Sequence, residues 1–294
     1  MPPRICSLLP SATEIVAQLG LIDSLVGVSE ECRWPPEVVG KPVVSTARVD
    51  PGELSDGQID RLVRESVGEG RSLYAVDAEL IDRLAPDLIV TQDLCAVCAV
   101  SSEGLAGACP VDTALLSLDP RTLGDVAASV RALAERLGVP ARGGEIVGEM
   151  EEKIDAVARA VRDRPRPRPR VFVAEWIDPP YCGGHWVPEM VARAGGADPL
   201  GRAGEPSRRV SWSEVLAREP QLVVLAPCGF GAEEAAARGA QLRLPCRTVA
   251  VDGDSCYSRP APRLADGVRQ LAHLIHPDAV PDPGLPEIEL ARGG

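Results

Sequence analysis

Short apolar runs alternate with helical patterns along nearly the whole chain of 294 residues. Of all the features of the sequence, this alternation restricts the possible folds the most. The run at residues 87–91 (DLIVT) is almost entirely apolar, which is typical of a parallel strand buried on both faces. Strands that alternate with helices in this way predict an α/β fold with parallel sheets. The other predicted strands cover residues 5–9, 25–28, 43–45, 114–118, 171–175, 221–226 and 248–251.

Helix signals separate these strands. Ser11 and Glu14 have the spacing of a capping box, Asp77 and Thr122 stand where N-caps are expected, and residues 211–214 (SWSE) repeat the capping-box pattern. Residues 144–163 form the longest helical pattern, about 30 Å at roughly 1.5 Å per residue, which suits a rigid spine. Its apolar face consists of Ile146, Met150, Ile154, Val157 and Val161.

These patterns predict two Rossmann-like lobes with mostly parallel sheets, joined by a long backbone α-helix, with a ligand cleft between the lobes. The expected parts are a first lobe (1–120), the helical spine with a stiff Pro/Arg connector (121–167), a second lobe (168–280) and a tail (281–294). Residues 52–73 are polar and Gly-rich and match neither a helix nor a strand, so their role stays open.

Charge and hydropathy exclude several functions. A net charge of −12 argues against nucleic acid as the main partner, because an acidic surface repels phosphate. We expect no membrane insertion, since no apolar stretch reaches the roughly 20 residues of a membrane helix. The first ten residues match neither a secretory signal nor a lipid-attachment context around Cys6. The expected location is therefore cytoplasmic.

Cysteine and aromatic residues gather directly after the predicted strands, at the edge where parallel sheets bind ligands. A row of aromatic rings there suits a large, flat and partly apolar ligand. Six of the nine cysteines have this position: Cys32, Cys95, Cys98, Cys182, Cys228 and Cys256. The candidate ligand-binding residues are Ser11, Trp34, Gln92, Trp176, Tyr181, His185, Trp186, Trp212, Phe230 and Tyr257.

The pair Cys95-Ala-Val-Cys98 has three interpretations. It is a thiol-redox pair, or part of a metal site completed by Cys182 or His185, or simple loop packing. Cys228 and Cys256 are further candidate metal ligands. His185 is interpreted as a ligand contact or an axial metal donor, whereas the remaining histidines and Cys6, Cys109 and Cys246 are interpreted as structural.

Catalytic motifs are missing from the sequence. It contains no G-x-S-x-G elbow, Walker loop, H-E-x-x-H or dinucleotide fingerprint. One loop histidine gives little basis for a nucleophile–base pair. We therefore predict a binding protein and not an enzyme.

Several segments resemble a known family. Residues 5–15 (ICSLLPSATEI) and 87–91 resemble the helical-backbone (class III) periplasmic binding proteins for vitamin B12 and ferric siderophores. Residues 171–180, 184–189 and 258–267 are similar to a cytoplasmic cobalamin-binding subgroup. The resemblance implies two lobes on one helix, a corrinoid or related chelate as ligand, and an ABC importer that acidic residues of each lobe contact. It assigns ring contacts to Trp34, Trp176, Tyr181, Trp212 and Tyr257.

Three hypotheses follow. The first is a binding protein for cobalamin or a similar metal chelate that serves storage, delivery or sensing. The second is a metal-binding or thiol-redox protein that uses Cys95, Cys98, Cys182 and His185. The third is the substrate-binding subunit of an ABC importer.

Overall fold

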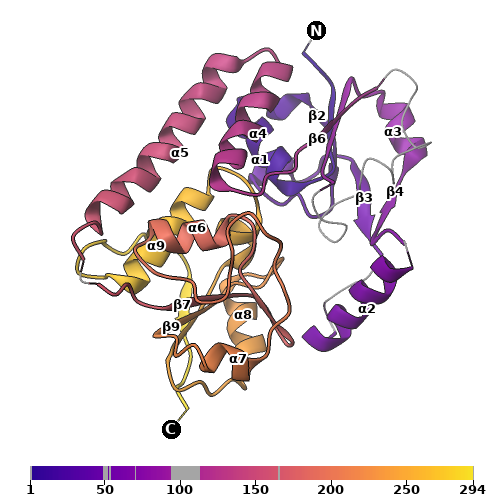
Figure 1. The fold of residues 1–294 in the computed structure, drawn as a ribbon. Coiled ribbons are helices and arrows are strands. Elements are labelled where there is room, and N and C mark those ends of the chain that lie inside the picture. Colours follow the sequence, from indigo (N-terminus) through magenta and orange to yellow (C-terminus); the bar gives the residue numbers. More distant parts are fainter. Residues whose placement is uncertain are drawn as a thin grey trace. The chain divides into compact units, whose positions relative to one another are not determined.

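The computed structural model describes residues 2–48, 52, 54–69, 71–93, 113–164 and 166–293 (Figure 1). They form two units, each with its own sheet. Unit 1 comprises residues 1–120 and 127–146, and unit 2 comprises residues 121–126 and 147–294. The α/β class and the two lobes with parallel-rich sheets are therefore confirmed, whereas a cleft between the lobes stays a prediction.

The sheet of unit 1 has the strand order β4-β3-β2-β1-β5-β6 and is parallel except for β4. Strand β5 (Leu88–Thr91), which lies between β1 and β6, is buried along its whole length, as the apolar run of residues 87–91 predicted. The other strands are β1 (Ile5–Ser7), β2 (Leu25–Ser29), β3 (Val43–Ala47), β4 (Tyr74–Val76) and β6 (Ala114–Ser117). The helices among them are α1 (Pro10–Gln18), α2 (Asp56–Gly68) and α3 (Ala78–Leu84).

Two sequence interpretations in unit 1 were wrong. Ser11 does not cap α1, because the helix already begins at Pro10, a residue suited to the first helical turn, and Ser11 and Glu14 are buried inside it. The polar stretch 52–73 contains a regular helix, α2. Its start is a complete capping box, in which Ser55 Oγ accepts a hydrogen bond from Gln58 N and Gln58 Oε1 accepts one from Ser55 N.

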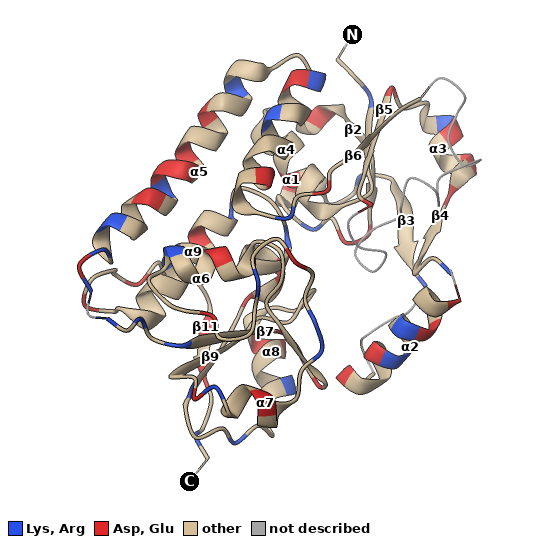
Figure 2. Ribbon diagram, viewed as in Figure 1, with Lys and Arg blue, Asp and Glu red and all other residues tan. Residues whose placement is uncertain are grey.

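Two consecutive helices, α4 (Leu123–Arg136) and α5 (Pro140–Ala160), belong partly to each unit. Thr122 caps α4 as predicted, since its Oγ1 accepts a hydrogen bond from Asp125 N at 3.1 Å. The predicted spine is α5, but it begins at Pro140, four residues earlier than the apolar pattern indicated. All five apolar residues of its predicted face are buried. Acidic and basic residues are both spread along this helix (Figure 2).

The sheet of unit 2 has the strand order β11-β10-β9-β7-β8, with a parallel centre and antiparallel edges. Its strands are β7 (Val171–Ile177), β8 (Pro180–Cys182), β9 (Leu222–Leu225), β10 (Arg247–Val251) and β11 (Glu287–Glu289). Its helices are α6 (Val187–Arg193), α7 (Trp212–Leu216), α8 (Ala232–Gly239) and α9 (Leu264–Ile275), with a π-helical turn at Asp254–Ser258.

The two edge strands of unit 2 were not predicted. Both have only three residues, too few to show an alternating pattern. As a result, Tyr181 and Cys182 lie in β8 and not in a loop, and residues 287–289 of the expected tail pair with β10. Among the described residues, no helix is long and apolar enough to cross a membrane.

Candidate functional site

The carboxyl ends of the three central strands of unit 2 meet at one edge of the sheet. Cys228 N, after β9, donates a hydrogen bond to the carbonyl oxygen of Glu175 in β7 at 3.1 Å. Asp254 N, after β10, donates one to the carbonyl oxygen of Phe230 at 3.2 Å. Three segments that are distant in sequence thus form one surface, in the position where open parallel sheets bind ligands.

An aromatic pair lies on this edge. The ring of Trp176, at the end of β7, lies 5.6 Å from the ring of Phe230, centroid to centroid, with a tilt of 37°. Arg238 covers Phe230, with its guanidinium carbon 4.0 Å from the ring centre. Phe230, which contacts both Trp176 and Arg238, is buried, whereas Trp176 is only half-buried. Trp176 is therefore partly exposed to solvent, and a ligand contact by its ring stays a prediction.

Trp186 and Tyr257 do not lie on an open rim, which corrects the expectation from their loop positions. Both are buried, and Tyr257 is only 1% exposed. Their polar atoms have partners inside, since Trp186 Nε1 donates to the Tyr257 carbonyl oxygen at 2.7 Å and Tyr257 Oη donates to Gln270 Oε1 at 3.1 Å. These bonds make burial of the two rings possible. A ligand contact by either residue stays a prediction.

The remaining candidates have different surroundings. Trp212 packs against the core of unit 2, edge-on to Phe172 at 6.0 Å. Tyr181 is half-buried in β8. In unit 1, Trp34 is half-buried after β2, whereas Ser11 and Gln92 are buried. The edge of unit 1 also holds a buried polar contact, in which Thr13 Oγ1 lies 2.8 Å from Ser7 Oγ and 3.0 Å from Cys32 Sγ.

Three charged residues that shape the edge of unit 2 were not singled out from the sequence. Glu175 Oε1 accepts a hydrogen bond from Gly184 N at 2.8 Å and so positions the loop that carries His185. Asp254 and Arg259 form a mostly buried ion pair with an N–O distance of 2.5 Å across the π-helical turn. The position of Glu175 at a strand end was the available signal, whereas the ion pair depends on folding of the turn.

His185 is half-buried beside Trp186, with the two rings 5.7 Å apart. Its backbone is left-handed, with a φ of 48°, and is held by hydrogen bonds to Glu205 and from Gly204. Burial lowers the pKa of His185, and the positive charge of Arg121 lowers it further. The ring is therefore neutral at pH 7 and able to donate a nitrogen lone pair.

We expect this low pKa to be measurable. The chain has three histidines, so NMR titration of their ring protons, assigned with a His185→Gln variant, isolates His185. Its pKa should lie below about 6.5, and Arg121→Gln should raise it only partway, because the burial remains. Because the folded chain binds a proton at His185 more weakly than the unfolded chain does, protonation of this residue favours unfolding. The free energy of unfolding should therefore be unaffected by His185 above about pH 6.5 and should decrease as the pH falls below that value. A pKa at or above the ordinary value would contradict the described environment.

The cysteines do not form a metal site among the described residues. Within those parts of the chain, no group of three His, Cys, Asp or Glu side chains is placed to hold a metal ion. Cys182 and Cys256 are buried, Cys228 is exposed, and burial raises the pKa of the Cys182 thiol, which disfavours the thiolate that metals bind. Cys95 and Cys98 lie outside the described residues, as does Cys109.

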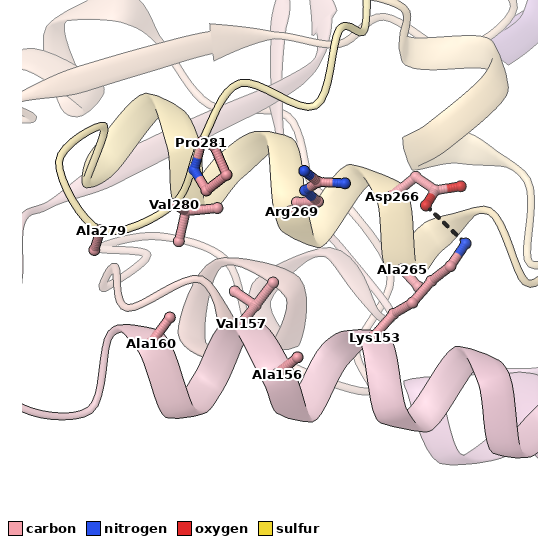
Figure 3. Close-up of a pocket in the computed structure, with 10 residues that line it drawn as sticks. All are labelled: Lys153, Ala156, Val157, Ala160, Ala265, Asp266, Arg269, Ala279, Val280 and Pro281. Carbon is pink, nitrogen blue, oxygen red and sulfur yellow. Dashed lines mark hydrogen bonds and ion pairs between the residues drawn. The ribbon is translucent and has the colours of Figure 1, made fainter.

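A groove of about 290 Å³ lies elsewhere in unit 2, between α5, α9 and residues 279–281 (Figure 3). Alanine and valine side chains line it, and an ion pair between Lys153 Nζ and Asp266 Oδ1 at 3.0 Å crosses one end. This groove contains no aromatic ring, and its volume is at the lower end for small-molecule sites. The aromatic edge is therefore the better candidate for a flat ligand.

Comparison with known proteins finds similarity to binding proteins, both in sequence and in structure. The family described as "Periplasmic binding protein" matches residues 5–242. The vitamin B12-binding protein of Vibrio cholerae is 24% identical over 92% of this chain and 88% of its own length. An uncharacterized ABC transporter substrate-binding lipoprotein of Bacillus subtilis is 24% identical over 94% of this chain and 81% of its own. The solved structure of a periplasmic heme-binding protein from Pseudomonas aeruginosa covers both chains completely with a TM-score of 0.73 at 20% identity, and so supports the fold.

These relatives overturn the predicted cytoplasmic location, which was wrong. The Pseudomonas protein is periplasmic and the Bacillus protein is a lipoprotein of an ABC transporter. The prediction relied on the first ten residues. They lead into the buried strand β1 and the start of α1, so their pattern reflects folding of unit 1 and carries no information about export.

Proposed function

The chain belongs to the periplasmic binding protein family, and we propose that it binds a corrinoid of the cobalamin type, or a similar flat metal chelate, outside the cytoplasm and delivers it to an ABC importer. The observation that carries the proposal is the similarity to a vitamin B12-binding protein across 92% of the chain. An importer as partner follows from the relative that is an ABC transporter substrate-binding lipoprotein. Binding without catalysis agrees with relatives that are substrate-binding proteins.

The edge of unit 2 supports a flat ligand. Trp176 and Tyr181 are both half-buried and directly opposite each other on β7 and β8, and Phe230 supports Trp176 from beneath. Aromatic rings at such a surface bury a large area of macrocycle at a small entropic cost, because each ring has few rotatable bonds. The polar neighbours Glu175 and His185 add contacts that orient a chelate.

A heme-type porphyrin is the second candidate. The fold is similar to that of a periplasmic heme-binding protein, and His185 has a neutral imidazole near the ring of Trp186. A neutral imidazole is a common axial ligand of heme iron. The thiol-redox alternative has less support from the described cysteines, since Cys182 and Cys256 are buried. Its central pair, Cys95 and Cys98, lies outside the described residues.

Titration of the purified chain with cyanocobalamin tests the proposal. We expect one corrinoid per chain to stay bound through a desalting column, detected by its visible absorbance, with saturable heat release in calorimetry. Hemin in a parallel titration identifies the second candidate, and its expected sign is a Soret shift that His185→Gln alters. Retention of neither chelate would overturn the proposed function.

A further inference from the structure

Three side chains on neighbouring strands of unit 2 form a row. Trp176 of β7 lies directly opposite Tyr181 of β8, and Tyr181 lies directly opposite Arg209 in an isolated antiparallel bridge. Side chains of directly opposed residues in antiparallel strands point to the same face of the sheet, about 5 Å apart. The register therefore orders the three residues as Trp176, Tyr181 and Arg209, with the arginine next to Tyr181.

This row points away from one hydrophobic core cluster of unit 2. The residues that follow its members in sequence, namely Ile177, Cys182 and Val210, all belong to the buried core cluster of unit 2. Successive side chains in a strand point to opposite faces, so Trp176, Tyr181 and Arg209 face the other way. Their exposure agrees, since the two aromatic residues are half-buried and Arg209 is exposed.

Tyr181 and Arg209 form the type of antiparallel pair that has the shorter distance between Cα atoms. Cys182 N donates a hydrogen bond to the Arg208 carbonyl oxygen at 3.0 Å, and Val210 N donates one to the Pro180 carbonyl oxygen at 2.9 Å. These bonds flank the pair of Tyr181 and Arg209, which makes it a non-hydrogen-bonded pair. Such pairs have the shorter separation, about 4.5 Å between Cα atoms. Arg209 is thus the residue next to Tyr181, at the end of the row that begins with Trp176.

The charge of Arg209 is not neutralised within the described part of the chain. Neighbouring arginines have acidic partners there, namely Glu214 for Arg208 at 3.0 Å and Glu205 for Arg202 at 3.8 Å. The side chain of Arg209 forms no ion pair or hydrogen bond with any described residue. A guanidinium is well suited to bind a carboxylate or a phosphate through two parallel hydrogen bonds.

We propose that Arg209 binds a peripheral oxyanion of the chelate while Trp176 and Tyr181 contact its macrocycle. The inference rests on the proposed function and deepens it, because it specifies an anionic group at the edge of the ligand. In cobalamin that group is the phosphodiester of the nucleotide loop, and in a heme-type porphyrin it is a propionate carboxylate. Arg209 then selects chelates that carry an anion over those that lack one.

The test compares two corrinoids in calorimetric titrations of wild type and Arg209→Gln. Cyanocobalamin carries the phosphodiester and dicyanocobinamide lacks it. We expect Arg209→Gln to weaken cyanocobalamin binding roughly 10- to 100-fold, the range for a hydrogen bond to a charged group, and to leave cobinamide binding within about twofold. If the ligand is a porphyrin, hemin shows the same loss. Higher salt should weaken cyanocobalamin binding by the wild type more than by the variant.

Arg208→Gln is the matched control. Arg208 is adjacent in sequence, points to the opposite face and is paired with Glu214, so its replacement removes the same charge without touching the row. Circular dichroism verifies that both variants fold. Wild-type affinity of Arg209→Gln for cyanocobalamin and hemin, or an equal loss in Arg208→Gln, would overturn this inference and leave the proposed function intact. Failure of the wild type to bind either chelate would remove both.

Discussion

Replacing Trp176 by alanine is expected to weaken cobalamin binding roughly 30- to 1000-fold, the range for a tryptophan at the centre of an interface. The ring ends β7, faces away from the core cluster and rests on Phe230 at 5.6 Å. It is not among the residues that pack against the core cluster, so its removal should cost the folded chain less stability than removal of a core-packed tryptophan. Calorimetric titration with cyanocobalamin measures the affinity, and urea denaturation measures the free energy of unfolding.

Trp212 provides a matched control for this prediction. It is also half-buried and also in unit 2, but it packs against the core and lies 6.0 Å from Phe172, edge to face. Trp212→Ala should therefore lower the free energy of unfolding by about 2–4 kcal/mol and change the affinity of the folded protein little. If Trp212→Ala lost binding while Trp176→Ala kept it, the ligand would have to lie on a different surface.

Replacing Gly184 by alanine should lower the free energy of unfolding by about 3 kcal/mol. A Cβ atom at this position would lie 2.2 Å from Ser207 N and 2.8 Å from the carbonyl carbon of Pro206. These are backbone atoms, which cannot rotate away as a side chain can. The loop that contains Gly184 and the segment that leads to Arg209 would have to separate, so ligand affinity should fall together with stability.

Gly148→Ala is the control that separates this clash from the general effect of a glycine replacement. Gly148 is exposed within α5, and its Cβ would meet no atom within 4 Å. Alanine there should raise the free energy of unfolding by about 0.5–1 kcal/mol, because glycine is the poorer helix former. Both variants are compared by urea denaturation with the same slope analysis. Wild-type stability of Gly184→Ala would show that the two segments are not packed as described.

Much of the fold was predictable because its signals are local. The apolar run of residues 87–91 became the buried strand β5, and Asp77 caps α3 through Leu80 N at 2.8 Å. Ser211 likewise caps α7 through Glu214 N at 3.1 Å. The errors were also local, since Ser11 lost its predicted cap once α1 began at Pro10, and the capping box at Ser55 was overlooked in a polar stretch.

The candidate site was predictable only in outline. Residues after strands β7, β9 and β10 do meet at one edge, because parallel strands present their carboxyl ends together. The sequence did not indicate which rings are buried there, because burial depends on partners far along the chain. Trp186 and the Tyr257 carbonyl that accepts its hydrogen bond are 71 residues apart.

The sequence by itself determined most of the secondary structure elements, their α/β order and the strand ends at which chemically distinctive residues gather, because periodicity and capping act within a few residues. Only the tertiary structure decided that Trp176, Tyr181 and Arg209 form one row. That row depends on the register of β7, of the three-residue strand β8 and of the segment around Arg209. A shift of one residue would turn each of these side chains to the other face, and the register is set by packing of their neighbours in the core of unit 2.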